Sequence, residues 1–307
     1  MKKLIFPATS RVHLARQKSL LDHLARYFEI YVTTYGEKDL NMSEVAVDIA
    51  GKFQKALNTI KPDLALIRGD RYEMLVPAML CAYNSIPIAH IEGFDLSGAI
   101  DNKVRYAISH LSDYHFVTNE ESYDRAKAMG FKNVWNFGSL DVEYALKSSQ
   151  TLGTEPGKAK QPYMMVLYHP VSNEDSNEVF EALKNFPDYK IIGIKSNKDY
   201  GLQTYTEEYS SEEFIKLLKG ASCLIGNSSA GIKEAPALGV SVVNIGDRQM
   251  NRLKSNNIID VACEADLITK AIDWQLKHKY EPDVTYSQEN TSGLIAEVIY
   301  GTYPQQI

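Results

Sequence analysis

Three acidic side chains and one histidine stand where a parallel sheet binds its ligands. Asp70, Glu92 and His169 each come directly after a short apolar run that predicts a β-strand. The carboxyl ends of parallel strands form the edge at which open α/β sheets bind small molecules. Asp101 begins a segment with helical spacing, and Arg105 lies four residues later on the same helix face. We therefore expect these side chains to converge on one site.

A group of carboxylates and a histidine is suited to proton transfer. Repulsion and burial raise the pKa of at least one carboxylate in such a group, which favours acid and base roles. His90 precedes Glu92 by two residues, so the two face the same side if the backbone is extended. The structural alternative is that Asp70 and Arg71 cap the helix after them and that Asp101 caps its own. For any one residue the two interpretations are balanced, and the set together favours chemistry.

A second group is suited to binding a diphosphate. Asn227, Ser228, Ser229 and Gly231 lie in the segment GNSSAG, between an apolar strand and a helical period. Hydroxyls and free N–H groups at a helix N-terminus bind phosphate, although Ser-Ser is also what ordinary helix capping uses. Glu234 follows on that helix, where a carboxylate can accept both ribose hydroxyls or simply be solvated.

Two arginines in predicted loops are further candidates for holding phosphate charge. Arg11 lies in the first strand-to-helix turn, and Arg248 lies in the string DRQMNR. Loop arginines bind phosphate well, although many are only surface residues. The histidines outside these groups lack the spacing of metal ligands, so we expect neither a metal nor a cofactor.

The elements that must position these residues alternate along the chain. Short apolar runs such as LIFPAT, 4–9, alternate with helical periods, which predicts parallel βαβ units with right-handed crossovers. One such series covers 1–150, and a second covers 162–286. A segment rich in Ser, Gly, Pro and Lys, 151–161, is the best linker candidate between them. We expect two Rossmann-like α/β domains with a ligand-binding cleft, and a final helix in 287–307 that packs back on the first domain.

Composition excludes several classes of protein. The 307 residues are 44% hydrophobic and carry a formal net charge of -6, so a nucleic acid is not the expected partner. No apolar run approaches the roughly 20 residues of a membrane span, and no secretion signal stands out, which predicts a cytoplasmic protein. Cys81, Cys223 and Cys263 are far apart in apolar surroundings and are expected to be small buried side chains.

Five long strings, spread over both halves of the chain, resemble one family. They are RGDRYEM at 68–74, HIEG and SGAIDNKVRYAISHLSDYHFVT within 90–118, FGSLDVE at 137–143, YHPVSNE at 168–174, and GNSSAGIKEAPALGVSVVNIGDRQMNR at 226–252. This text is similar to the UDP-N-acetylglucosamine 2-epimerases, and to the hydrolysing branch used in making sialic-acid-like sugars. The resemblance implies a GT-B-like pair of Rossmann domains with the active site in the interdomain cleft, and a homodimer.

The resemblance also implies roles for single residues. It places Asp70, Glu92, Asp101 and His169 at the catalytic positions. Asn197 lies in SNKD, 196–199, which is similar to the family's SN-D turn. The full set expected to bind the UDP-sugar is Arg11, Arg71, His90, Arg105, Asn197, Asn227, Ser228, Ser229, Gly231, Glu234 and Arg248.

The activity that the resemblance implies is elimination followed by hydration. A carboxylate removes the C2 proton of UDP-N-acetylglucosamine, UDP leaves, and water adds to give N-acetylmannosamine. The string HPVSNE stands where the non-hydrolysing branch usually carries an HRREN-like string, which favours hydrolysis. Phe94 replaces a usual glycine and Asn102 replaces a common acid. Three alternatives stay open. The departures leave room for a UDP-diacetamido-sugar 2-epimerase or an inactive nucleotide-sugar binder, and the same scaffold also serves GT-B glycosyltransferases.

Overall fold

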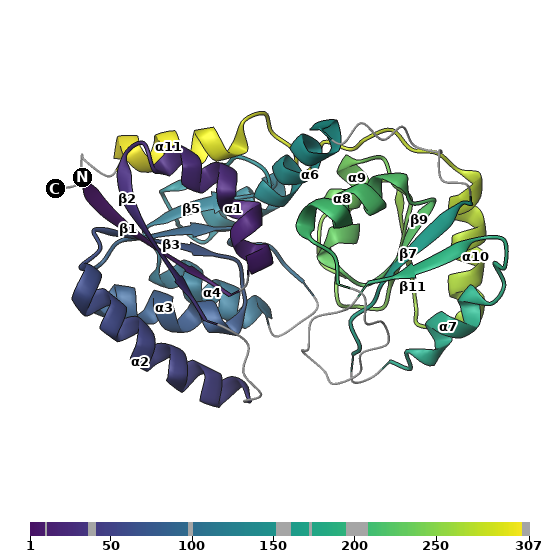
Figure 1. Ribbon diagram of the computed structural model, residues 1–307, viewed down its shortest axis with the longest axis horizontal. Helices are drawn as coiled ribbons and strands as arrows, with labels where there is room; N and C mark the ends of the chain where they lie inside the picture. Colours follow the sequence, from purple (N-terminus) through teal and green to yellow (C-terminus); the bar gives the residue numbers. More distant parts are fainter. Residues whose placement is uncertain are drawn as a thin grey trace. The chain divides into compact units, whose positions relative to one another are not determined.

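The computed structural model describes residues 1–9, 11–35, 41–97, 101–151, 161–171, 174–194 and 208–302. The chain divides into two compact units (Figure 1). Unit 1 is Met1–Leu140 with Gln288–Ile307, and unit 2 is Asp141–Ser287. The division after Leu140 precedes the linker expected from composition. Helix α6 (Leu140–Thr151) runs up to that linker, whose residues 152–160 lie outside the described part.

Unit 1 is built on a parallel sheet with the strand order β2-β1-β3-β4-β5-β6. Its strands are β1 (Lys2–Ala8), β2 (Phe28–Thr34), β3 (Leu64–Arg68), β4 (Ile88–Ile91), β5 (Tyr114–Val117) and β6 (Val134–Asn136). Its helices are α1 (Arg11–Leu24), α2 (Met42–Ile60), α3 (Tyr72–Tyr83), α4 (Asp101–Leu111), α5 (Glu120–Ala128) and α11 (Thr291–Thr302). The predicted alternation of strands and helices is confirmed.

The two faces of this sheet hold separate apolar clusters because successive side chains of a strand point to opposite sides. Leu4 and Phe6 of β1 join the cluster under α1 and α11, whereas Ile5 joins the cluster under α2 and α3. Figure 1 shows these helix pairs on opposite faces. Helix α2 buries Ile49, Phe53 and Leu57, which recur every four residues, and Asn41 and Glu44 form a capping box at its start.

The last helix of the chain returns to unit 1. Helix α11 lies beside α1, the first helix (Figure 1). The hydroxyls of Ser19 and Ser292 are 2.9 Å apart, and Thr291 donates to the carbonyl oxygen of Phe137 at 2.6 Å. Residues more than 150 positions apart in the chain thus share the core of unit 1.

Unit 2 is built on a second parallel sheet, with the strand order β11-β10-β9-β7-β8. Its strands are β7 (Tyr163–Leu167), β8 (Lys190–Gly193), β9 (Cys223–Gly226), β10 (Val242–Ile245) and β11 (Ile258–Val261). Besides α6, its α-helices are α7 (Asn177–Leu183), α8 (Ser211–Gly220), α9 (Glu234–Ala237) and α10 (Ala265–Lys277). Over the described ranges of both units, no helix has the length and apolar content that a bilayer span requires.

One element of unit 2 differs from expectation. The GNSSAG segment was expected to open a regular helix, but β9 is followed by one turn of 3-10 helix, Ser229–Gly231, and then by the four-residue α9. Pro236 in α9 has no N–H to donate, and Gly239, with φ +72°, turns the chain into the left-handed region two residues after α9. The helical period of the sequence is therefore broken into two short turns.

The cysteines are free thiols. Cys81 and Cys223 are buried, and burial raises the pKa of each to about 12. Cys263 is only half-buried. The expectation of small buried side chains is confirmed for the first two and too strong for the third, which follows the last strand, β11.

Candidate functional site

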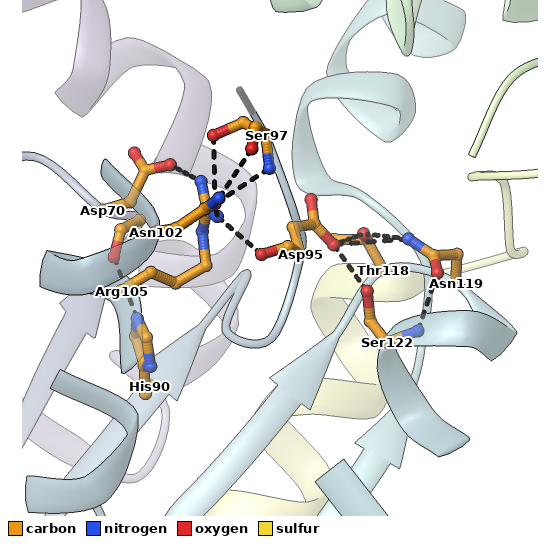
Figure 2. Close-up of polar contacts among 10 residues, drawn as sticks. Asp70, His90, Asp95, Ser97, Asn102, Arg105, Thr118, Asn119 and Ser122 are labelled. Atoms are coloured by element: carbon orange, nitrogen blue, oxygen red, sulfur yellow. Dashed lines mark hydrogen bonds and ion pairs between the residues drawn. The ribbon is translucent and has the colours of Figure 1, made fainter. Parts of the chain in front are cut away.

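The first candidate group lies at the carboxyl edge of the unit 1 sheet, around an ion pair. Nη2 of Arg105, on α4, donates to Oδ2 of Asp70, which follows β3 (Figure 2). Nη1 of the same guanidinium donates to the carbonyl oxygen of Asp95 at 2.5 Å and to Oδ1 of Asn102 at 2.8 Å. The Arg105 side chain is 1% exposed and that of Asp70 is 25% exposed. Arg105 is therefore an internal support, and Asp70 is the partner that reaches solvent.

A second carboxylate stands at the end of the neighbouring strand. Oε1 of Glu92 accepts from Nη2 of Arg68 at 3.0 Å and from the hydroxyl of Ser139 at 3.2 Å. Its side chain is 12% exposed. Strand β4 ends at Ile91, and Glu92 itself has φ +65°. The expectation that Glu92 and His90 face the same side assumed an extended backbone, and the left-handed conformation at Glu92 removes that assumption.

His90 is fully buried beneath the same edge. Its Nε2 lies 2.9 Å from the carbonyl oxygen of Gly69, and its Nδ1 lies 3.1 Å from the hydroxyl of Ser109. A carbonyl only accepts, so we assign the proton to Nε2 and let Ser109 donate to Nδ1. Burial lowers the pKa of His90 to about 4, which leaves the ring neutral at pH 7. His90 thus ties the residue before Asp70 to α4.

The turn after β4 is held by polar contacts that sequence analysis missed. The carboxylate of Asp95 accepts from the hydroxyls of Ser122 at 2.8 Å and Thr118 at 3.1 Å (Figure 2). Oδ1 of Asn102 accepts from the N–H of Ser97 at 2.8 Å, and its Nδ2 donates to the Ser97 carbonyl oxygen at 2.6 Å. A carboxylate at position 102 could not donate a hydrogen bond to the Ser97 carbonyl oxygen. The asparagine that replaces the family's acid therefore holds this turn in place.

Asp101 and Arg71 have clear places at this edge. Asp101 is the half-buried first residue of α4, the helix that also supplies Arg105. Arg71 is the N-cap residue of α3 and makes no side-chain cap bond; its Nη2 donates to Oε1 of Glu73 at 2.7 Å. The capping alternative raised for Arg71 is therefore not what the structure has.

The second candidate group lies at the carboxyl edge of the unit 2 sheet. His169 follows β7, and its N–H donates to Oδ1 of Asn227 at 2.7 Å. Nδ2 of Asn227 donates back to the carbonyl oxygen of His169 at 2.8 Å. The carbonyl oxygen of Asn227 in turn accepts from Nη1 of Arg248 at 3.0 Å. The structure thus brings three of the expected residues together, and the side chains of His169 and Arg248 are partly exposed.

The remaining expected residues of unit 2 surround the 3-10 turn. The hydroxyl of Ser228 accepts from the N–H of Ala230 at 3.3 Å, Ser229 is exposed, and Gly231 is buried. Glu234 is buried at the start of α9. A hydroxyl-lined turn replaces the full helix terminus that was expected to hold a diphosphate.

Two expected residues have no described side chain. Arg11 is the first residue of α1, and its side chain lies outside the described part. Asn197 and the whole SNKD string also lie outside the described residues. The roles expected for both stay predictions.

The YHPVSNE segment is also fastened through its tyrosine and glutamate. The hydroxyl of Tyr168 donates to Oε2 of Glu174, and burial together with this bond raises the pKa of Tyr168. Gly246, with φ +69°, follows β10 at this point, where a Cβ would overlap the Glu174 carboxylate. Across the described ranges, no three His, Cys, Asp or Glu side chains gather as ligands for a metal ion.

Comparison with known proteins identifies the family. The family model described as UDP-N-acetylglucosamine 2-epimerase matches residues 11–300. The chain belongs to the UDP-N-acetylglucosamine 2-epimerase family. A family member named UDP-N-acetylglucosamine 2-epimerase, from Neisseria meningitidis serogroup B, is 35% identical over 259 residues, 76% of this chain and 68% of that protein. The family resemblance expected from the sequence strings is confirmed.

Other relatives carry a different sugar in their names. The UDP-N,N'-diacetylbacillosamine 2-epimerase (hydrolyzing) of Legionella pneumophila is 33% identical over 278 residues, 81% of this chain and 72% of that protein. Among solved structures, the UDP-GlcNAc 2-epimerase of Methanocaldococcus jannaschii, in complex with UDP-GlcNAc and UDP, superposes with a TM-score of 0.83 at 17% identity. That match covers 97% of this chain and 99% of the other, and it confirms the expected GT-B-like fold class.

Sequence analysis missed several residues that lie inside the matching strings or between two of them. Arg68 stands in RGDRYEM, Ser139 stands in FGSLDVE, and both contact Glu92. Asp95 stands in the gap between HIEG and SGAID. The signal that could have found Arg68 and Ser139 is their place within the strings. Single residues there were weighed only if their type suggested proton transfer or phosphate binding.

Proposed function

We propose that this protein is a hydrolysing UDP-N-acetylglucosamine 2-epimerase, which converts UDP-N-acetylglucosamine and water into UDP and N-acetylmannosamine. One observation carries the proposal within the family. Asp70 and Glu92, at the ends of adjacent strands β3 and β4, are each paired with an arginine, Arg105 and Arg68. Ion pairing with an arginine favours the ionised form of a carboxylate, which is the form that can accept a proton.

The first step that we propose is an elimination. One carboxylate among Asp70, Glu92 and Asp101 takes the proton from C2, and the electrons of that C–H bond form a double bond between C1 and C2. The bond from C1 to the diphosphate oxygen breaks, and UDP leaves with its electron pair. The site holds the C2–H bond next to the carboxylate that removes its proton, and such positioning lowers the activation free energy of proton transfer.

The second step is the addition of water. The water oxygen bonds to C1 and gives one proton to an ionised carboxylate of the site. The electrons of the C1–C2 double bond form a new C–H bond at C2 with a proton from the face opposite to the one that lost it, which inverts that carbon. A second carboxylic acid or His169 supplies this proton. The sequence string HPVSNE and the relatives named as hydrolyzing support hydration as the fate of the intermediate.

We assign the nucleotide half of the substrate to unit 2. Arg248 and the Ser228 and Ser229 hydroxyls neutralise the charge that develops on the departing diphosphate. Gly231, Glu234 and Asn197 of unit 2, with Arg11 of unit 1, are further nucleotide contacts that the family resemblance suggests. We also expect a homodimer in the cytoplasm, and light scattering on the purified chain tests the oligomeric state.

A diacetamido sugar is the second candidate substrate. The relative from Campylobacter jejuni named GDP/UDP-N,N'-diacetylbacillosamine 2-epimerase (hydrolyzing) is 35% identical over 240 residues, 68% of this chain and 62% of that protein. The Legionella relative also carries this sugar in its name. This substrate needs the same chemistry at C2 and differs from N-acetylglucosamine only away from the reacting carbons.

The test is turnover in deuterated water with UDP-N-acetylglucosamine and UDP-N,N'-diacetylbacillosamine, followed by NMR of the products. We expect free UDP and a 2-epimeric sugar that carries deuterium at C2. UDP release without deuterium at C2 would contradict elimination and would favour a glycosyltransferase or a simple hydrolase. Deuterium incorporation with the UDP-sugar left intact would instead indicate the non-hydrolysing reaction.

A further inference from the structure

Asn227 is fully buried, and its side chain contacts the backbone of His169 twice. Oδ1 accepts from the N–H of His169 at 2.7 Å, and Nδ2 donates to its carbonyl oxygen at 2.8 Å. Two opposed hydrogen bonds to one residue fix both its position and its orientation. With no exposed surface, the Asn227 side chain is not placed to touch a substrate.

The backbone of Asn227 holds a second functional residue. Its carbonyl oxygen accepts from Nη1 of Arg248 at 3.0 Å and from Nε2 of Gln249 at 3.1 Å. Gln249 is buried, whereas Arg248 is partly exposed. One residue therefore contacts both the segment that carries His169 and the arginine assigned to the diphosphate.

We propose that Asn227 is a positioning residue that orients His169 through its side chain and Arg248 through its carbonyl oxygen. This role replaces the substrate contact that the sequence suggested, and it rests on the proposed function. Asn227 therefore fixes the position of His169, to which we assign proton transfer, relative to Arg248, to which we assign the leaving diphosphate. Small displacements of such groups are costly because reaction rates depend steeply on alignment.

The position requires a side chain that accepts on one side and donates on the other. An aspartate keeps the acceptor for the His169 N–H but sets a second oxygen against the His169 carbonyl oxygen. A protonated carboxylic acid has one donor and one acceptor and restores the pattern. Gly226, directly before Asn227, has φ +143°, and a Cβ there would overlap the carbonyl oxygen of Leu167. The backbone therefore brings Asn227 close to the end of β7.

The test compares Asn227→Asp with Asn257→Asp. Asn257 is a matched control because it is buried in the same unit and donates from Nδ2 to a backbone carbonyl, that of Val240, at 2.5 Å. At pH 7.5 we expect Asn227→Asp to lower kcat about 100-fold, the scale of a displaced catalytic group. KM and the Kd for UDP should change less than about threefold, because the carbonyl contact to Arg248 remains.

The pH dependence separates positioning from a general loss of stability. As the pH falls toward 5.5, the introduced carboxyl group takes up a proton, and the ratio of variant to wild-type kcat should rise. For Asn257→Asp, the ratio of variant to wild-type kcat should not change with pH. The two variants should lose a similar amount of Tm. Equal kcat values for the two variants, or an Asn227→Asp ratio that does not change with pH, would overturn the proposal.

A second measurement does not depend on turnover. The ring NMR signals of His169, assigned by their loss in His169→Gln, should move in Asn227→Asp and stay in place in Asn257→Asp. Unmoved signals overturn the positioning role. If the His169 signals move in Asn227→Asp but the wild-type protein turns over no UDP-sugar, the proposed function is wrong and the positioning role stands. If Asn227→Asp does not fold, Asn227→Ser, which keeps one acceptor, takes its place in the NMR comparison.

Discussion

Arg105 donates to the carboxylate of Asp70 from a position where its own side chain is 1% exposed. The guanidinium also holds the Asp95 carbonyl oxygen and Oδ1 of Asn102, so its charge is distributed over three acceptors from three segments. Only a planar group with several N–H donors can satisfy this arrangement. The contact therefore joins the fold of unit 1 to the chemistry that we propose for it.

Arg105→Met should destabilise unit 1 and abolish most activity. Removing one member of a buried ion pair leaves the other charge uncompensated. We expect the unfolding free energy to fall by about 3 kcal/mol, which is the low end of the usual range for buried ion pairs because Asp70 is partly exposed. Urea unfolding measures this. Arg125→Met is the control, because Arg125 donates to the Phe94 carbonyl oxygen in the same turn at 2.5 Å, and it should cost only about 1 kcal/mol. Equal losses for the two variants would argue against a special role for the ion pair.

Glu92→Gln should separate chemistry from nucleotide binding. The amide oxygen can still accept from Arg68 and Ser139, but it cannot take a proton from carbon. We expect turnover to fall at least ~100-fold, the scale for losing a general base or acid, with the Kd for UDP unchanged. Calorimetry with UDP and a product assay measure the two quantities. Glu143→Gln removes another shielded, ion-paired carboxylate, the partner of Lys147, and should retain turnover.

The buried His90 should make stability depend on pH. Its pKa is lowered from 6.5 to about 4, chiefly by burial, so between these values the unfolded chain binds a proton that the folded chain does not. Stability therefore rises with pH through this range and falls on acidification. From pH 7 to pH 5 we expect His90 alone to lower the unfolding free energy by about 2 kcal/mol.

Urea unfolding at the two pH values tests this prediction for His90. His90→Gln keeps a donor toward the Gly69 carbonyl oxygen and should reduce the pH dependence. Part of it should remain, because burial also lowers the pKa of His115, to about 3. His278→Gln, at an exposed position after α10, should leave the dependence as it is. An unchanged slope in His90→Gln would show that the His90 ring is not the responsible group.

Phe94 stands in a backbone conformation that favours glycine. It has φ +62°, yet its buried ring contacts those of Phe131 and His115, with centroids 4.8 and 5.3 Å apart. Losing a buried phenylalanine costs about 3 kcal/mol or more, which exceeds the roughly 1 kcal/mol of left-handed strain that glycine relieves. We expect Phe94→Gly to destabilise the protein, but less than Phe94→Ala does. The reverse order in thermal unfolding would contradict the strain argument.

Most of the fold follows from local patterns in the sequence. Apolar runs predicted the strands because the central strands are buried on both faces, and the four-residue spacing from Val45 to Leu57 is typical of a helix such as α2. The pattern failed after β9, where an apparent helical period contains Pro236 and is followed by Gly239. It also failed at Glu92, where a left-handed residue ends the strand. Both failures are backbone conformations that side-chain periodicity does not report.

The candidate site was only partly predictable. Residues after strand ends were found because the strand order of parallel sheets places them at one edge. The partners that hold them were missed, since Arg68 and Ser139 are distant from Glu92 in sequence and have no chemical role of their own. The contact between Asn227 and His169 spans 58 positions and depends on the pairing of β7 with β9. Sequence spacing carries no information about such a contact.

Gly226 also limits how this protein can be redesigned. It lies opposite Leu167 in the pairing of β7 with β9, where there is no room for a side chain. A mutant library built to accept other sugars can diversify Phe94 or Asn102, which lie in unit 1, without touching this pairing. In any variant of the library that replaces Gly226, the new side chain would force strands β7 and β9 apart. The codon for this glycine is therefore one to hold constant in directed evolution.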